Sequence, residues 1–175
     1  QLKHANIVDA LECVPGPGKT WISIMELIEG DSLEKLLEDR GPIQDPEVFS
    51  SILSQLCDGL EYAHERGVIH RDLKPDNIII RSDVEGTSIK ILDFGLAKLQ
   101  QDLQRLTKSG VVLGSPAYMS PEQCMGDPLD IRSDIYSLGV LAFEMLTGKL
   151  PYEEKTPVAM MRAHCDPDRL PLTLS

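Results

Sequence analysis

The sequence has no excess of positive charge, no paired cysteines and no apolar run long enough to cross a membrane. Its 28 acidic residues outnumber its 17 lysines and arginines, for a net charge of −11, whereas phosphate backbones and anionic lipid surfaces are bound by clustered cations. The most apolar run, residues 135–146, contains Glu144 and is shorter than the roughly 20 residues that span a bilayer. We therefore expect no nucleic acid partner and no membrane contact from this segment.

The four cysteines, Cys13, Cys57, Cys124 and Cys165, lie far apart and form no C-x-x-C pair. This spacing indicates neither a zinc site nor a disulfide framework, and it favours a reducing, cytoplasmic compartment. We expect no signal peptide within residues 1–13, because they contain no start methionine and run straight into a strand-like pattern. We expect both ends of the chain to be cut edges of a longer domain.

The Gly-Lys-Thr at residues 18–20 suggests a phosphate-binding P-loop, but its context does not fit. A P-loop needs a glycine five residues before Gly18, and Cys13 stands there. A helix should also follow, whereas residues 20–27 are rich in the β-branched and aromatic side chains that are typical of strands. We therefore expect a turn between two strands, at residues 7–14 and 20–27, and no phosphate site in it.

The pattern after this hairpin predicts one mostly helical α+β domain. Asp45 and Ser120 are expected helix caps, because each is followed by a proline at the first helical position. A further helix is expected to begin at Ser133 and to end at Gly148. This last helix is apolar on nearly every face, so we expect it to be the buried central post of the domain.

Polar residues that suit phosphoryl transfer gather around two short strands, expected at residues 77–81 and 88–92. Asn77 stands at the start of the first strand and Asp93 directly follows the second, so an antiparallel hairpin would bring them together at one end. Carboxylate and amide oxygens are ligands that Mg²⁺ prefers. In the loop just before, Asp72 supplies a carboxylate for base work and Lys74 a cation for a phosphate. The set predicts a metal-assisted phosphoryl-transfer site.

These motifs resemble those of the large lobe of a eukaryotic-type protein kinase, over about residues 2–167. The stretch "HRDLKPDN", residues 70–77, resembles the catalytic loop. "DFG", residues 93–95, and "SPE", residues 120–122, resemble the two ends of the activation segment. The resemblance implies a kinase-like α+β fold with a mostly helical large lobe and a short N-terminal β-hairpin remnant of the small lobe.

The resemblance also implies a division of the chain and a role for each polar residue. Residues 1–28 would be the end of the small lobe and the hinge, and residues 29–175 a large lobe truncated at its C-terminus. Asp72 would accept or orient the proton of the substrate hydroxyl, Lys74 would contact the γ-phosphate, and Mg²⁺ would be held by Asn77 and Asp93. The residues implied to bind ATP are Met25, Glu26, Ile28, Ser32, Lys74 and Ile79.

Further residues are implied to support or regulate the site. Asp134 would brace the backbone of the catalytic loop, and Ser115 would bond to the catalytic aspartate and lysine. Glu122 would normally pair with an arginine from helices beyond this chain. Arg71 and Lys98 would lie side by side and attract a phosphate group. Thr107 and Ser109 match the phosphorylated positions of bacterial kinases, so a phosphate on either hydroxyl could bind between the two cations.

The implied activity is transfer of the γ-phosphate of ATP to serine and threonine hydroxyls of proteins. Lys74 within "DLKPDN" is typical of serine/threonine kinases, and "GSPAYMSPEQ", residues 114–123, resembles the bacterial ones. The segment itself would be cytoplasmic. A membrane tether outside this segment and a dimer of the parent protein are both compatible with that reading.

The chain departs from the family pattern in what it does not contain. The glycine-rich loop, the lysine that binds the α- and β-phosphates, and its glutamate partner would all precede residue 2. We therefore expect this fragment alone to be weakly active or inactive. A truncated pseudokinase or regulatory binding module stays an alternative, although Asp72, Asn77 and Asp93 are all intact. A lipid or small-molecule kinase of related fold is a second one, which Lys74 disfavours.

Other residues are given structural roles. We expect His4, His64 and His164 to lie at the surface or at helix ends, and His70 to be a core residue beneath the site. Trp21 is expected to pack within its strand.

Overall fold

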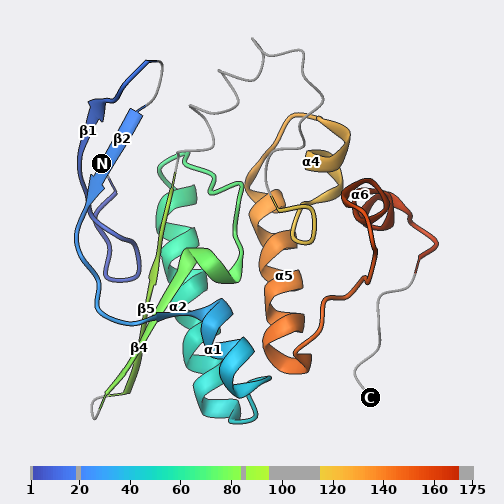
Figure 1. The fold of residues 1–175 in the computed structure, drawn as a ribbon, viewed down its shortest axis with the longest axis horizontal. Coiled ribbons are helices and arrows are strands. Elements are labelled where there is room, and N and C mark those ends of the chain that lie inside the picture. The colour runs from blue at the N-terminus through green and yellow to red at the C-terminus, as the bar shows by residue number, and fades with distance from the viewer. Residues whose placement is uncertain (1, 19–20, 84–85, 95–114, 170–175) are drawn as a thin grey trace.

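The computed structural model describes residues 2–18, 21–83, 86–94 and 115–169. Its strands and helices follow in one order along the chain (Figure 1): β1 Ala10–Pro15, β2 Trp21–Met25, β3 Asp31–Ser32, α1 Leu33–Arg40, α2 Pro46–His64, the 3₁₀ turn η1 Pro75–Asn77, β4 Ile78–Asp83, β5 Gly86–Ile91, α4 Pro121–Met125, α5 Ile131–Thr147 and α6 Pro157–Cys165. Among these described residues, no helix combines the length and the apolar character needed to cross a bilayer.

Two helices begin where the sequence predicts. The Asp45 carboxylate accepts the backbone N–H groups of Glu47 and Val48 at the start of α2. At the start of α4, the Ser120 hydroxyl accepts the N–H of Gln123, whose side chain accepts the N–H of Ser120 in return. Both signals lie within four residues of sequence, which is why the sequence alone predicts them.

The predicted start and environment of α5 were wrong. The helix begins at Ile131 with Asp130 as its cap, because the Asp130 carboxylate accepts the N–H of Arg132. Ser133 therefore lies inside the first turn. The helix is also not buried all round, since the side chain of Ile135 is 54% exposed. Its C-terminal end at Thr147, with Gly148 in the left-handed conformation, was predicted correctly.

The strands form two small antiparallel sheets. β1 pairs with β2, and Pro15 stands opposite Trp21, so the predicted hairpin is confirmed. Trp21 is nevertheless 54% exposed rather than packed. β4 and β5 pair as predicted, with Ile79 opposite Lys90, and the two-residue strand β3, which was not predicted, adds to the free edge of β4.

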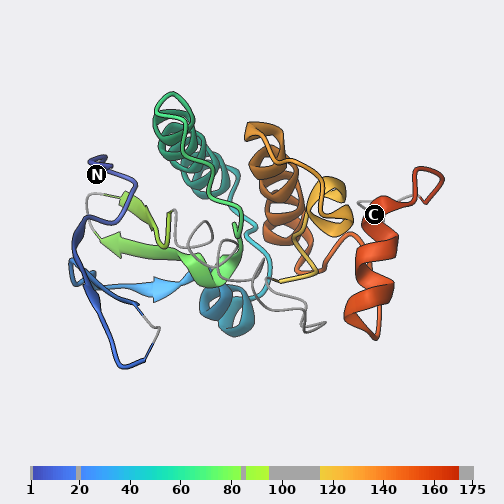
Figure 2. The same cartoon turned by 90° about the horizontal axis from the view of Figure 1, so that it is seen from above.

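The core lies where α1, α2 and α5 pack with the β4–β5 hairpin (Figures 1 and 2). Ile7 joins this layer from the N-terminal segment through a parallel bridge to Ile91. The fully buried members of this core are apolar and lie between residues 33 and 145: Leu33, Ile52, Leu56, Leu73, Ile78, Ile91, Leu141 and Met145. Burying side chains of this size stabilises the fold by roughly 1.5–3 kcal/mol each. The packing holds the end of β5 and the loop after α2 against one another.

Candidate active site

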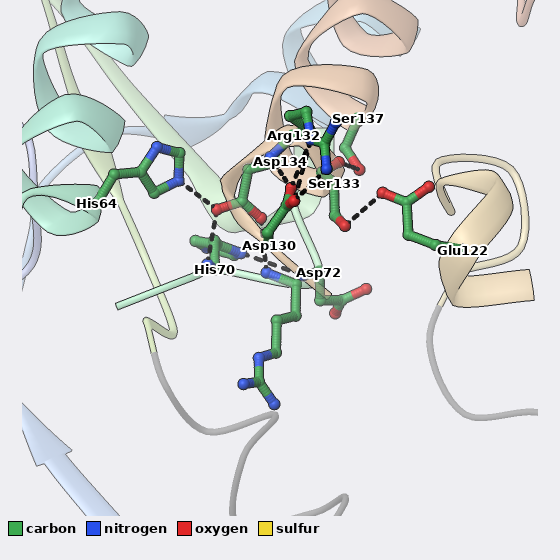
Figure 3. Close-up of polar contacts among 10 residues, drawn as sticks. His64, His70, Asp72, Glu122, Asp130, Arg132, Ser133, Asp134 and Ser137 are labelled. Atoms are coloured by element: carbon green, nitrogen blue, oxygen red, sulfur yellow. Dashed lines mark hydrogen bonds and ion pairs between the residues drawn. The ribbon is translucent and has the colours of Figure 1, made fainter. Parts of the chain in front are cut away.

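The loop between α2 and β4 is held by one carboxylate. Asp134, in the first turn of α5, accepts the backbone N–H groups of His70 and Arg71, both at 2.8 Å. Its Oδ2 also accepts from Nε2 of His64 at 2.7 Å (Figure 3). The Asp134 side chain is 1% exposed, so these bonds lie in a low-dielectric interior, where they are strong. The predicted bracing contact of Asp134 is present.

His70 ties this loop to the end of β5. Its Nε2–H donates to the carbonyl of Leu92 at 2.7 Å, and its Nδ1 accepts the N–H of Asp72 at 3.3 Å. The ring also meets Phe94 edge-on, with centroids 4.7 Å apart. Complete burial lowers the pKa of His70, which keeps the ring neutral with one donor and one acceptor nitrogen. A structural role beneath the site, as predicted, fits these contacts.

Two residues of the site have a left-handed backbone that side chains seldom adopt. Arg71 has φ 73° and Asp93 has φ 61°. Such conformations cost of order 1–3 kcal/mol, and they persist where surrounding contacts hold them. The bond from the Arg71 N–H to Asp134 holds Arg71 in this conformation. The bond from His70 to the Leu92 carbonyl holds the loop next to the residue that precedes Asp93.

Asn77 brings the two segments together. Its Nδ2 donates to the Asp72 carbonyl at 2.8 Å and lies 3.5 Å from Asp72 Oδ2, while its backbone carbonyl accepts the N–H of Leu92 at 2.8 Å. Asp72, Asn77 and the residue before Asp93 are therefore neighbours, as predicted from the hairpin.

The donor set of these residues fits a divalent cation. The bonds of the Asn77 amide use its nitrogen and leave Oδ1 for a cation, and Asp93 supplies a half-buried carboxylate. Within the described part of the chain, no group of three or more His, Cys, Asp or Glu side chains is placed to hold a metal ion. Oxygen donors such as those of Asn77 and Asp93 can hold a divalent cation that completes its shell with water and substrate phosphates.

Lys74 lies among carboxylates rather than against Asp72. Its Nζ is 3.6 Å from Asp76 Oδ2. Asp76 also shares a hydrogen bond with Glu34 of α1, and this bond, burial and the nearby charge raise the pKa of Glu34. The side chain of Lys74 is 23% exposed, so its ammonium group can reach an anion at the surface of the loop.

Three of the four residues predicted to surround the adenine base line one cavity. A cavity of about 370 Å³ is lined by Glu26, Ile28 and Ile79 among others. Met25 lies at the end of β2, outside this lining. Ser32 caps α1, with its hydroxyl accepting the N–H of Lys35 at 3.2 Å, and its predicted contact with ATP stays a prediction.

The residue that directly follows the predicted activation segment contacts the loop between α2 and β4. Gln123 of α4 donates through Nε2 to the carbonyl of Arg71 at 2.6 Å. Glu122 accepts the hydroxyl of Ser133 at 2.5 Å (Figure 3). Burial alone would raise the pKa of Glu122, but hydrogen bonds from Ser133, Ser120 and its own N–H hold it below the usual value. Glu122 thus has a partner within this chain, which the sequence did not predict.

Three of the predicted regulatory residues, Lys98, Thr107 and Ser109, lie outside the described residues. Ser115, the first described residue after them, is half-buried. Its predicted bond to Asp72 and Lys74 stays a prediction.

Two histidines lie at helix ends, as predicted, at the end of α2 and of α6, but neither side chain is exposed to solvent. The side chain of His64 is only 9% exposed and bonds to Asp134. His164 is 5% exposed, and its Nδ1 lies 2.7 Å from the Tyr136 hydroxyl. A sequence signal existed for His64, which follows the buried Leu60 by four residues and so shares its helix face. Gln123 was recognised only as a capping residue, because its bond to the catalytic loop is not local.

Comparison with known proteins gives consistent results. The family described as "Protein kinase domain" matches residues 1–170. The serine/threonine-protein kinase Pkn1 of Myxococcus xanthus is 41% identical over 162 residues, which are 92% of this chain and 23% of that protein. The serine/threonine-protein kinase PknB of Mycobacterium leprae is 36% identical over 173 residues, covering 97% of this chain and 27% of that protein. This chain therefore spans about a quarter of the length of these relatives.

A solved structure gives the same answer. The crystal structure of a mutant PknI kinase domain from Mycobacterium tuberculosis superposes with a TM-score of 0.67 at 28% sequence identity. The match covers 87% of this chain and 54% of that chain.

Proposed function

Because the chain belongs to the protein kinase domain family, we propose that it is the catalytic portion of a serine/threonine protein kinase. The observation that carries the proposal is the junction of two segments far apart in sequence, the loop around Asp72 and the end of β5 before Asp93. His70 and Asn77 join them through hydrogen bonds of 2.7 and 2.8 Å to Leu92. The matched relatives are named as bacterial serine/threonine kinases.

Each residue of the junction has a proposed task. Asp72 is half-buried, and its carboxylate orients and accepts the proton of a serine or threonine hydroxyl of the protein substrate. Asn77 and Asp93 hold Mg²⁺, which neutralises the phosphates of ATP when it is bound. Lys74 contacts the γ-phosphate, leaving Asp76 as charge develops there. The hinge at Glu26 and Ile28 binds the adenine base, over Ile79.

Regulation by phosphorylation extends this proposal. Arg71 adjoins Asp72, and a phosphate on Thr107 or Ser109 would bring about −1.5 to −2 charges and one to three charge-assisted hydrogen bonds to Arg71 and Lys98. Gln123, which follows the activation segment, donates to the carbonyl of Arg71. Arg71 is therefore already in contact with the end of that segment. We place the domain in the cytoplasm, where ATP is supplied; a dimer and a membrane tether of the parent protein stay predictions.

The test is phosphate transfer by the full-length protein that contains this segment. The wild-type protein is incubated with Mg-ATP and a generic basic protein, and phosphoserine and phosphothreonine are measured by mass spectrometry, with Asp72→Asn as the matched control. Transfer by wild type and none by Asp72→Asn supports the proposal. Wild-type protein that binds partners but transfers no phosphate would favour a pseudokinase or binding module.

A further inference from the structure

Lys90 stands where the parts of the nucleotide site meet. It lies in β5 three residues before Asp93 and directly opposite Ile79 on β4. Its Nζ is 2.8 Å from Oε1 of Glu26 and donates to the carbonyl of Ile7 at 3.1 Å. A single ammonium group therefore contacts the hinge and the segment before β1 at the same time.

Glu26 is held by further bonds to the segment before β1. Its Oε1 also accepts the N–H of Asp9 at 2.9 Å, and its own N–H donates to the Asp9 carbonyl at 3.0 Å. The hydrogen bonds from Lys90 and from the Asp9 backbone lower the pKa of Glu26 and keep it ionised. These bonds use the carboxylate and the amide N–H of Glu26, and none of them uses its carbonyl oxygen.

The same residues border the cavity beside the hinge. Glu26, Ile28, Ile79 and Lys90 all line its volume of about 370 Å³. β5 is anchored along its length, because it pairs with β4 and because Ile91 exchanges backbone hydrogen bonds with Asn6 and Val8. A bond from Lys90 to the hinge therefore links the hinge to the strand that leads to Asp93.

We propose that Lys90 is a positioning residue for the nucleotide, whose ion pair with Glu26 fixes the hinge backbone over Ile79 and at a set distance from Asp93. This rests on the proposed function, since it supposes that the hinge binds the adenine base of ATP. A hinge held in place before binding loses less conformational freedom when the base arrives, so its affinity is higher. Lys90 approaches neither Asp72 nor the phosphate end of the site, so the transfer step itself does not depend on it.

The test compares nucleotide affinity with turnover in the full-length protein. Lys90→Met keeps the aliphatic stem and removes the ammonium group. Because the pair is about one-quarter to one-third exposed, we expect a modest effect, a roughly five-fold rise in the Kd and KM for Mg-ATP. The kcat and the KM for a peptide substrate should stay within about two-fold. Lys90→Arg, which keeps a cation and donors for both Glu26 and Ile7, should restore the affinity for Mg-ATP.

The matched control is Lys149→Met, which removes the same charge from an exposed lysine just after α5 and should leave every parameter unchanged. An unchanged Kd for Mg-ATP in Lys90→Met, with wild type binding normally, overturns the positioning role alone. Equal losses in peptide KM, kcat and Mg-ATP affinity, together with a lower unfolding midpoint, would also overturn it, because they indicate a merely structural pair. Wild-type protein that does not bind Mg-ATP overturns both this inference and the proposed function.

Discussion

The Asp134 carboxylate accepts the backbone N–H of Arg71 at 2.8 Å, and Arg71 is held at φ 73°. The same carboxylate accepts from the His70 N–H and from His64. An acceptor that is almost fully buried thus holds the strained residue next to Asp72. The geometry of the catalytic loop depends on a helix more than sixty residues further along the chain.

Asp134→Asn tests this dependence. An amide has one acceptor oxygen in place of two, and its NH₂ group faces donors, so at least one buried N–H loses its partner. We expect a loss of about 2–4 kcal/mol in the free energy of unfolding, measured by denaturant titration. Turnover should fall with it, because Arg71 and Asp72 are no longer held. Asp130→Asn is the control on the same helix, since asparagine caps as well as aspartate; an equal loss there would contradict the special role of Asp134.

Asp72→Asn and Asp93→Ala should both abolish phosphate transfer in the full-length protein, by different routes. Asp93→Ala removes a metal ligand, so the affinity for Mg-ATP should fall. Asp72→Asn should leave nucleotide affinity almost unchanged and lower kcat by on the order of 10²–10⁴, because its task concerns the acceptor hydroxyl. Titration calorimetry with Mg-ATP separates the two. Equal losses of affinity would mean that the roles are wrongly assigned.

The 175-residue chain by itself should have little kinase activity. It contains no glycine-rich loop and no lysine for the α- and β-phosphates, and positioning and electrostatics supply nearly all the catalysis of phosphoryl transfer. The purified chain is assayed with Mg-ATP and a generic basic protein, beside the full-length protein. Turnover by the 175-residue chain in the usual range for kinases, roughly 1–100 per second, would contradict this expectation.

Replacing Thr107 and Ser109 together with alanine should lower activity on an external substrate in the full-length protein. The reason is the loss of a phosphate that would order the segment against Arg71. Arg71→Ala should lower activity in the same direction. The measurement is phosphate transfer to a peptide before and after preincubation with Mg-ATP. If the double variant keeps full activity, control by this segment is not phosphorylation at these positions.

His164 should contribute a pH dependence to stability. Burial lowers its pKa in the folded state, whereas an exposed histidine titrates at about 6.5. Above about pH 6.5 both states are neutral and the full stability is present. Below it the unfolded chain binds the proton first, so stability is lost as the pH falls through the folded-state pKa.

His164→Asn keeps an acceptor near the Tyr136 hydroxyl and cannot titrate. Its free energy of unfolding should therefore fall less than that of wild type between about pH 7 and pH 5. His70 adds a slope of the same sign and Glu34 and Glu144, whose pKa values are raised, add slopes of the opposite sign, but all three are common to both proteins. Parallel pH profiles for wild type and variant would contradict the assignment.

Much of the fold could be predicted because its signals are local. The caps at Asp45 and Ser120, the turn that excludes a P-loop, and the β4–β5 hairpin each rest on a few adjacent residues whose backbone preferences act within one turn. That Asn77 and the end of β5 are neighbours could also be predicted, since a hairpin brings them to the same end of it. The chemical roles of Asp72, Lys74, Asn77 and Asp93 stay predictions. The two-residue strand β3 could not be predicted, because it has no pattern of its own.

Only the tertiary structure decided which distant residues hold the site in place. His64 meets Asp134 across 70 residues, Glu26 meets Lys90 across 64, and Gln123 meets Arg71 across 52. Sequence determines the charge and the hydrogen-bonding capacity of each of these groups. It does not determine their partners, because a buried polar group takes whichever partner the packing of helices and strands brings within reach. That is why the bond between His64 and Asp134 was not predicted, and why Glu122 was expected to lack a partner although Ser133 lies beside it.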